Sequence, residues 1–414
     1  MRTGVALDGH AAQNGRKTMT NLITRRNFVG GVAVGAGLAA LGGRALAQQL
    51  PLPTSPVTLN IIDVAGNLAL TQKAIENYRK AKPNLVSRIT FTKAPAPELA
   101  GKIKAQQDAG RVDIDLVLTG TDALSAGIDQ KLWVELIPQH AGALPKLDDI
   151  YLPAAAKMQT LAKGQGVVVT YYPSGPLLEY MPDKVKTVPT TAEELLAYTK
   201  ENPGRLIYAR PANSGPGRTF IMGLPYLLGD SNPQDPAKGW DKTWAYLKEL
   251  GQNIEYYPSG TGAVMKELGE GSRDMTVSTT GWDINPRVLG VVPKEAKVAA
   301  LKGFHWVADA HYMCVPKGLS NDKLAVLIDL MNFLLTKEQQ AYTYDEGYFY
   351  PGPAVKDVTL DMAPPESQAA IKEYGRPEYE KWIAENPIEL PLQPEQMVVA
   401  FRMWDEQVGG GKRK

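Results

Sequence analysis

Two arginines flank a loop that is rich in glycine, proline and serine, and together they could hold an anion. The stretch 210–219 begins with Arg210, contains Ser214, and ends with Arg218 and Thr219. A guanidinium group forms forked hydrogen bonds with carboxylate, phosphonate or phosphate. Unpaired N–H groups at the start of a helix favour the same groups, and a helix is predicted directly after this loop. The plainer alternative is a pair of surface arginines, each beside an acid, and the sequence leaves both open.

Aromatic and acidic residues elsewhere offer the opposite chemistry, the recognition of an organic cation. Trp282 and Trp306 could stack on a flat ring or a cation. Asp122, Asp283 and Asp309 could neutralise ammonium groups. The two tryptophans could equally fill a hydrophobic core. A positively charged solute is therefore the alternative to a small organic anion.

The other candidate contacts are polar residues at predicted strand ends, because open α/β sheets bind ligands beyond the carboxyl ends of their strands. For His311, a buried histidine with satisfied hydrogen bonds is the commoner alternative. The complete predicted ligand-binding set is Asn67, Thr119, Thr121, Asp122, Tyr172, Ser174, Arg210, Asn213, Ser214, Arg218, Thr219, Thr280, Trp282, Trp306, Asp309 and His311.

No metal site, cofactor or catalytic residue is predicted. Tyr171–Tyr172 and Tyr256–Tyr257 could supply oxygen ligands to ferric iron, but neighbours along a strand point to opposite faces. The single cysteine, Cys314, lies in an apolar run and is expected to be a small buried residue. The sequence has no motif of a serine hydrolase, a zinc protease or a P-loop nucleotide-binding protein.

Strands and helices alternate along the chain, which predicts an α/β fold. Such alternation is typical of an open, mostly parallel sheet covered by helices. Apolar runs predict strands at 57–62, 89–92, 114–118, 167–171, 206–209, 275–280 and 312–316. Helical spacing or flanking signals predict helices at 70–82, 98–109, 220–228 and 321–336.

The first 47 residues contain the three parts of a secretory signal. Arg25 and Arg26 precede a weakly apolar run at 30–43, and small residues at 45–47 follow it. The paired arginines resemble a twin-arginine signal, which the Tat translocon recognises, and we expect the mature chain to start near Gln48. The whole chain has 45 basic and 44 acidic residues, a balance that argues against nucleic-acid binding.

Four segments occur in an order that is typical of one known family. The segment 113–118 is similar to the strand before that family's first ligand loop, and 167–173 is similar to its crossover strand. The segment 202–219 is similar to its second-lobe loop, and the stretch from His311 to Gly318 precedes a helical segment ending in NFLLTKEQQ. Over about residues 57–360 the chain thus resembles the extracellular solute-binding protein family 1, which has a two-lobed type II fold.

This resemblance implies a receptor of an ABC importer and not an enzyme. Such a receptor closes its lobes around a small solute and presents it to permease subunits. We expect a periplasmic monomer that does not bind nucleic acid and that meets the Tat translocon during export. A receptor for a polyamine, a thiamine-like compound or another organic cation is the alternative, and a Tat-exported enzyme is the alternative class.

The resemblance also implies how the chain is divided. Each lobe is expected to be a mostly parallel sheet with flanking helices, and two crossover segments are expected to form a hinge. The expected parts are a signal peptide at 1–47, lobe one at 54–169 plus 308–360, lobe two at 170–307, and C-terminal helices at 361–414 that pack on lobe one.

Overall fold

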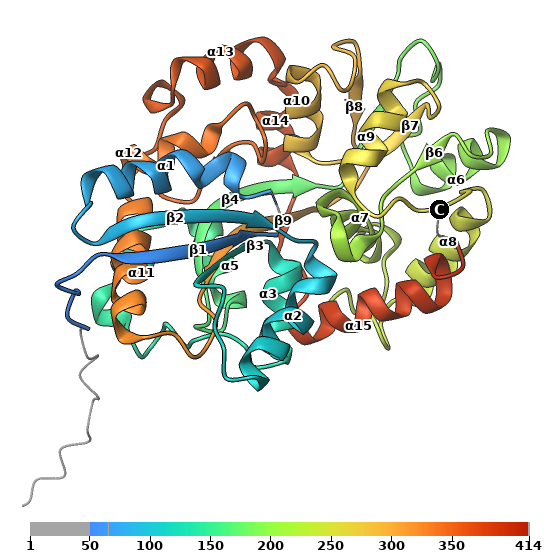
Figure 1. Cartoon of the computed structure of the whole chain (residues 1–414). Helices are drawn as coiled ribbons and strands as arrows, with labels where there is room; N and C mark the ends of the chain where they lie inside the picture. Colours follow the sequence, from blue (N-terminus) through green and yellow to red (C-terminus); the bar gives the residue numbers. More distant parts are fainter. Residues whose placement is uncertain (1–49, 65, 413–414) are drawn as a thin grey trace, which may run out of the picture. The chain divides into compact units, whose positions relative to one another are not determined.

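The computed structural model describes residues 50–412 apart from residue 65, and it contains two β-sheets with helices on their faces (Figure 1). The predicted α/β class is confirmed, whereas the predicted signal segment lies outside the described residues. The strands are β1 (Val57–Asp63), β2 (Val86–Lys93), β3 (Leu116–Thr119), β4 (Val167–Gly175), β5 (Leu177–Tyr180), β6 (Leu206–Ile207), β7 (Met275–Ser278), β8 (Lys297–Ala299), β9 (Trp306–Cys314), β10 (Gly352–Pro353) and β11 (Ile388–Glu389).

The helices lie on the faces of both sheets. Those of residues 50–170 are α1 (Leu68–Ala81), α2 (Ala96–Asp108), α3 (Thr121–Asp129), α4 (Leu147–Ile150) and α5 (Pro153–Leu161). Then follow α6 (Ala192–Glu201), α7 (Gly215–Leu228), α8 (Asp241–Gln252), α9 (Thr261–Gly269), α10 (Thr280–Val288), α11 (Asn321–Leu334) and α12 (Lys337–Gln340). The C-terminal segment contains α13 (Pro365–Tyr374), α14 (Glu378–Glu385) and α15 (Pro394–Trp404).

The first sheet has the strand order β10-β4-β9-β3-β1-β2, and β11 pairs with β9. Strand β1 runs parallel to both β2 and β3. Its residues Leu59, Ile61 and Ile62 are buried, as expected for a strand of a parallel sheet that helices cover on both faces. The carboxyl ends of β1 and β3 therefore lie at one edge, where the loops after them supply candidate ligand contacts.

Strands β4 and β9 connect the two lobes and introduce antiparallel pairing into the first sheet. The chain leaves the first sheet along β4 and returns along β9, so these strands run in opposite directions and pair antiparallel. Strand β9 is also antiparallel to β3, and in the second sheet, ordered β6-β7-β5-β8, only β6 and β7 pair in parallel. Both sheets are therefore mixed rather than mostly parallel.

The change from one sheet to the other falls at Pro176. Strand β4 stays in the first sheet as far as Gly175, which pairs with Val307, and β5 begins in the second sheet at Leu177. The chain re-enters the first sheet at Trp306. The structure thus places the first crossing at Pro176 rather than at 170, whereas the return at Trp306 is close to the expected 308. The first crossing comes later because β4 stays paired with β9 as far as Gly175.

Two helix starts show how local sequence sets the element boundaries. Thr191 caps α6, since its hydroxyl accepts a hydrogen bond from the Glu194 amide at 3.2 Å. Helix α7 begins at Gly215, earlier than the predicted 220, because Ser214 caps it. Gly217 allows α7 to lie close to the second sheet, since a Cβ atom there would be 2.3 Å from the carbonyl oxygen of Ala209.

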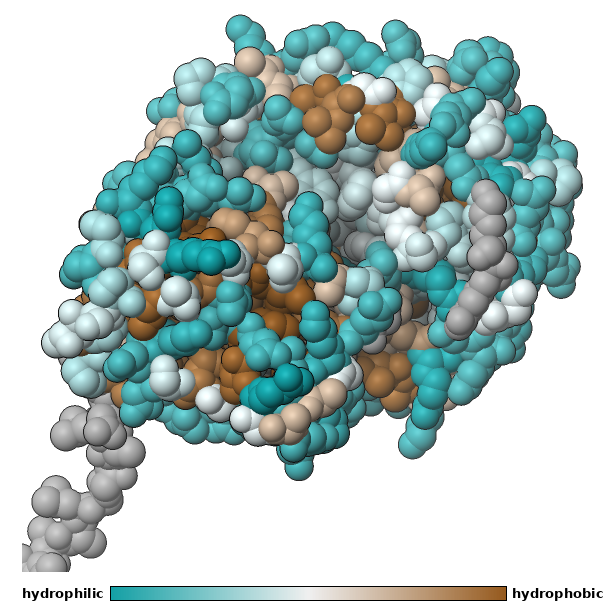
Figure 2. Space-filling view, viewed as in Figure 1, coloured by the Kyte–Doolittle hydropathy of each residue, from teal (hydrophilic) through white to brown (hydrophobic). Residues whose placement is uncertain are grey.

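Each sheet has its own hydrophobic core. The first core includes Leu116, Val168, Met313 and Val326, and the second contains Phe220, Trp240 and Leu247 together with other apolar residues. Cys314 is fully buried in the first core, and burial raises the pKa of its thiol. The face shown in Figure 2 is largely hydrophilic, with hydrophobic residues gathered in patches.

The C-terminal segment contacts both lobes, which corrects the expectation that it packs on lobe one alone. Helix α15 lies against α3 of the first lobe (Figure 1). Its last residue, Trp404, is buried in the second core and makes edge-to-face contacts with Tyr208 and Tyr257. The physical reason is that the buried apolar residues of α15 include Met397, which contacts Ser125 of α3, and Trp404, so that the helix packs against both lobes.

Candidate functional site

A cavity of about 230 Å³ is lined by residues from both lobes. Its walls come from loops and helix starts at the strand ends, where the sequence predicted ligand contacts. The lining residues are Val64, Asp122, Asn213, Ser214, Gly215, Arg218, Gly260, Thr261, Trp282, His311, Tyr348 and Phe349. This size suits a small metabolite better than a drug-sized molecule.

Arg218 joins the two lobes across this cavity. It lies in the first turn of α7, and its side chain is only 5% exposed. Its Nη1 atom lies 2.9 Å from Oδ2 of Asp122 on α3, and its Nη2 atom lies 2.6 Å from Oδ2 of Asp309 on β9. The two carboxylates hold the guanidinium in one orientation, while its Nε–H lies outside both ion pairs.

The carboxylate of Asp309 is saturated with donors. Besides Arg218 it accepts hydrogen bonds from the Thr121 hydroxyl at 3.2 Å, the Tyr172 hydroxyl at 3.3 Å and the Ala310 amide at 2.9 Å. Burial, with a further contribution from Asp309, raises the pKa of Tyr172, so this residue stays a neutral donor. Asp309 therefore orients Arg218 at the cavity, and its carboxylate oxygens are already occupied by protein donors.

The N-termini of α7 and α9 meet at the cavity. Ser214 caps α7 by accepting a hydrogen bond from the Gly217 amide at 3.1 Å, and its hydroxyl is 2.8 Å from that of Thr261, the first residue of α9. Helix α9 has no side-chain cap. The first amides of a helix have no partner within it, and they carry the positive end of the helix dipole. The free amides come mainly from α9, because in α7 Pro216 has no N–H and the Gly217 N–H is bound by Ser214. Together with the dipoles of both helices and Arg218, they make this wall suited to an anionic group.

His311 contributes to the cavity from β9 and is fully buried. Neither of its ring nitrogens has a hydrogen-bond partner among the described residues, which corrects the expectation of a satisfied histidine. Burial lowers the pKa of His311 to about 3, more than the nearby Asp309 raises it, and Arg218 lowers it further. The imidazole is therefore neutral at physiological pH and can offer one donor and one acceptor.

An aromatic loop completes the cavity and was missed from the sequence. The rings of Tyr348 and Phe349 lie 4.7 Å apart, and Phe349 is 4.1 Å from the His311 ring. Phe349 has a φ of 71°, which is strained for a bulky residue. Tyr348 also contacts Trp282, at 5.4 Å between ring centroids. The only signal was the density of Gly and Tyr around 347–350, without the periodicity that would mark a strand or helix.

Three predicted residues lie outside this cavity. Arg210 pairs with Asp405 and lies 5.2 Å from the Trp404 ring, so it holds the C-terminal segment. Trp306 is buried in a small core and donates its indole N–H to the Trp382 carbonyl at 3.1 Å. Thr280 donates to the carbonyl of Tyr350 at 2.7 Å. The structure thus places these three residues away from this cavity with partners for their polar groups, although Arg210 lines another cavity together with Asn213.

Other predicted residues do not line the cavity but stabilise the loops that carry the lining residues. Thr121 orients Asp309, and Asn67 accepts a hydrogen bond from Thr71 within the first turn of α1. Thr119 and Thr219 bond to nearby backbone carbonyls. Ser174 is buried with a φ of 70°, next to the crossing between lobes. These residues shape the loops, whereas Asp122, Asn213, Ser214, Arg218, Trp282 and His311 line the cavity itself.

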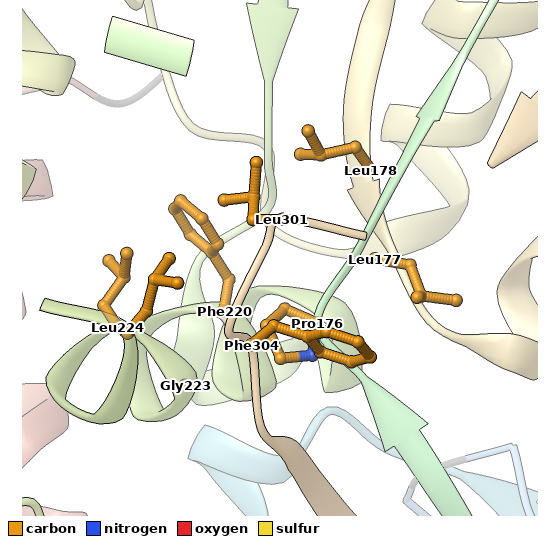
Figure 3. Close-up of a pocket in the computed structure, with 9 residues that line it drawn as sticks. Pro176, Leu177, Leu178, Phe220, Gly223, Leu224, Leu301 and Phe304 are labelled. Atoms are coloured by element: carbon orange, nitrogen blue, oxygen red, sulfur yellow. The ribbon is translucent and has the colours of Figure 1, made fainter. Parts of the chain in front are cut away.

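A second, apolar pocket lies at the crossing between the lobes (Figure 3). Pro176, Phe220, Gly223 and Leu301 are among the residues that line it. Its volume of about 10 Å³ is room for roughly one water molecule, so it cannot hold a solute. We interpret it as a packing gap where β4 passes into β5.

Two further observations concern metals and membranes. Within residues 50–412 apart from 65, no group of three His, Cys, Asp or Glu side chains is placed to hold a metal ion. In the same part of the chain, none of the helices combines the length and the hydrophobicity that a membrane span requires.

The fold is that of a two-lobed α/β protein with a cavity lined by residues of both lobes. Residues 73–373 match the family described as bacterial extracellular solute-binding protein, so the chain belongs to this family. The family is one of solute receptors of ABC importers and not a class of enzymes. No curated sequence is similar enough to count as a match.

Solved structures with the same fold include several periplasmic binding proteins. AfuA from Actinobacillus pleuropneumoniae, with fructose-6-phosphate bound, is 16% identical with a TM-score of 0.63, over 85% of this chain and 98% of that one. A periplasmic thiamin-binding protein is 14% identical with a TM-score of 0.60, over 88% and 100%. A putative spermidine/putrescine ABC transporter protein from Listeria monocytogenes is 15% identical with a TM-score of 0.58, over 84% and 99%. At these identities the similarity shows the fold alone.

Proposed function

We propose that this protein is a periplasmic receptor that captures a small organic anion in the cavity between its lobes and delivers it to an ABC importer. The observation that carries the proposal is the convergence of the α7 and α9 N-termini beside Arg218 in a cavity that both lobes line. A solute bound there would contact both lobes at once, and a ligand with this property stabilises the closed state.

The charges of the cavity favour an anion over a cation. Asp122 lines it, but its oxygens already accept from Arg218 at 2.9 Å and from the Ala123 amide at 2.8 Å. Asp309 has four donors of its own. A bound amine would have to displace Arg218 from these carboxylates, whereas an anion finds helix amides and the remaining guanidinium N–H groups available.

One observation supports the alternative of an organic cation. Trp282, Tyr348 and Phe349 supply aromatic rings to the cavity, and aromatic faces attract cations. The relatives of known structure are named for sugar phosphate, thiamin and polyamines, so their names do not decide the sign of the charge. The same rings would stack equally well on a flat or apolar part of an anion.

The remaining parts of the proposal concern where the receptor acts. Residues 1–47 would direct export by the Tat pathway, and the mature protein would act in the periplasm as a monomer. Its partners would be the solute and the permease subunits of the importer. A permease gene and an ATPase gene beside this gene would support the assignment independently.

The proposal is tested by a thermal-shift screen of the mature protein. Inorganic phosphate, organic phosphates and carboxylates are compared with putrescine and spermidine, because a ligand that binds only the folded state raises the melting temperature. We expect stabilisation by the anions. Stabilisation by the diamines alone would overturn the anion assignment, and stabilisation by none of these compounds would count against a receptor for small charged solutes.

A matched pair of cap variants locates the anion. Ser214→Ala and Ser320→Ala each remove a helix cap, on α7 and α11 respectively. Each is expected to cost about 1 kcal/mol of stability. Only Ser214→Ala should weaken anion binding, since Ser320 does not line the cavity. Equal weakening by both variants would contradict the proposed location.

A further inference from the structure

The proposed function leaves open which part of the solute is recognised by the wall of the cavity that the first lobe supplies. That wall holds Val64, Tyr348, Phe349 and His311. The imidazole of His311 is a fully buried polar group in this wall. Neither of the two ring nitrogens has a protein partner among the described residues. Buried polar groups are nearly always hydrogen-bonded, and an unsatisfied one costs free energy, so this exception requires an explanation.

None of the described groups around His311 forms a hydrogen bond with its ring, and the hydroxyl of Thr170, which faces His311 across β4 and β9, is likewise without a partner. Asp309 lies two residues away on the same face of β9, but its carboxylate is already engaged by Arg218, Tyr172 and Thr121. The Phe349 ring, which covers the imidazole at 4.1 Å, has no hydrogen-bonding group. Both ring nitrogens are shielded from solvent, and because His311 is among the residues that line the cavity, we expect a solute to approach the ring from that side.

The geometry points to His311 as the residue that sets the specificity of this site, through hydrogen bonds to an uncharged hydroxyl or amide group of the solute. This inference rests on the proposed function, in which the solute's anionic group lies on the N-termini of α7 and α9. The solute class is then a small hydroxylated organic anion, such as a polyol phosphate or a hydroxy acid. A neutral imidazole both donates and accepts, so it suits a hydroxyl group, which does the same.

The two halves of the site have separable roles. The anion wall, made by Ser214, Thr261 and Arg218, supplies attraction that is common to all anions of suitable size. His311 distinguishes among these anions, because a solute without a hydroxyl group leaves its nitrogens unpaired. A site built to hydrogen-bond a substrate group discriminates strongly against analogues that lack it.

Three probes separate these roles when binding is measured by titration calorimetry. Inorganic phosphate tests the anion wall alone, propyl phosphate adds an apolar chain, and glycerol 1-phosphate adds hydroxyl groups to a chain of the same length. We expect the wild type to prefer glycerol 1-phosphate to propyl phosphate by about tenfold. His311→Leu should abolish this preference and leave the affinity for inorganic phosphate unchanged, and His311→Gln should restore part of it.

The stability of the solute-free protein distinguishes recognition from a structural role. Replacing a buried, unsatisfied imidazole by an apolar side chain should leave the melting temperature unchanged or raise it. The matched control is His305→Leu, because His305 pairs with Glu389 and stacks on Tyr226 away from the cavity. This control should keep the hydroxyl preference.

Three outcomes would overturn the inference, and they differ in what they imply for the proposed function. A hydroxyl preference that survives in His311→Leu would overturn the inference while leaving the proposed anion receptor intact. A lower melting temperature together with a uniform loss of affinity for all probes would assign His311 a structural role and also overturn it. If the wild type binds none of the three phosphates, the anion site of the proposed function is wrong, and the inference falls with it.

Discussion

The guanidinium of Arg218 lies 2.6 Å from the carboxylate of Asp309, and both side chains are almost completely buried. The arginine belongs to a helix of the second lobe, and the aspartate belongs to the strand by which the chain returns to the first. This ion pair therefore holds the lobes together at the cavity. Buried pairs depend on each other, because removing one partner leaves an uncompensated charge.

Loss of Arg218 should destabilise the protein and abolish anion binding. Arg218→Met leaves Asp122 and Asp309 without their shared partner, and we expect it to lower the free energy of unfolding by about 3–5 kcal/mol. Urea denaturation measures this change. Adding Asp309→Asn should recover part of the loss, with a coupling energy of about 1 kcal/mol or more. Arg205→Met is the control, since the Arg205 side chain is exposed and its pair with Asp274 is long, at 3.7 Å, so that it should matter little.

The protein should lose stability at alkaline pH because of Glu179. This fully buried residue of β5 has its pKa raised to about 8, first by burial and then by the charge of Asp283, although Arg287 and Arg376 oppose the shift. Its pKa in the unfolded chain is near 4.5, so stability is full below that value and falls as the pH rises through 8. The loss amounts to roughly 1.4 kcal/mol for each unit of pKa shift.

Denaturation at pH 6 and pH 9 tests the contribution of Glu179. Glu179→Gln should flatten the pH dependence, because the amide does not ionise. Glu270→Gln should not change it, since Glu270 is an exposed residue paired with Lys266. A wild type whose stability is equal at the two pH values would contradict the prediction.

Enlarging Gly217 should disturb the anion wall. A Cβ atom at this position would lie 2.3 Å from the Ala209 carbonyl oxygen, so Gly217→Ala must move the start of α7. We expect a loss of about 1–3 kcal/mol in stability and weaker anion binding. Gly101→Ala is the matched control in α2, where a Cβ meets nothing within 4 Å and about 0.4–1 kcal/mol of stability should be gained. Equal effects of the two variants would exclude this packing argument.

Truncation of Trp404 should destabilise the second lobe although it lies near the C-terminus. Its indole is 1% exposed, and its N–H lies 3.1 Å from the Tyr208 hydroxyl. Trp404→Ala should lower the free energy of unfolding by about 3–5 kcal/mol. Arg402→Ala, at an exposed position of the same helix, should change it by about 0.5 kcal/mol or less. Chemical denaturation followed by tryptophan fluorescence and circular dichroism compares the two.

Export should depend on the paired arginines of the predicted signal. Replacing Arg25 and Arg26 by lysine preserves the charge but removes the twin-arginine pattern. We expect the unprocessed chain to accumulate in the cytoplasm, as measured by cell fractionation and the mass of the product. Normal processing of this variant would indicate export by a different route.

Local sequence patterns determined the elements of this protein and the class of its fold. The apolar run at 57–62 became β1, the threonine at 191 became a helix cap, and the loop before Arg218 became the entrance to a helix at the cavity. These features follow from side-chain periodicity and capping, which act over a few residues. The resemblance to solute-binding proteins depended on the order of such elements.

Only the tertiary structure decided which residues meet. Arg210 and Arg218 are alike in sequence, yet one holds the C-terminal segment while the other links the lobes. Tyr348 and Phe349 reach the cavity from a strained loop that has no periodic pattern, and only the structure shows that the His311 ring lacks a hydrogen-bond partner among the described residues. The reason is that a hydrogen bond or an ion pair depends on the distance between groups far apart in the chain, and packing of the two lobes sets that distance.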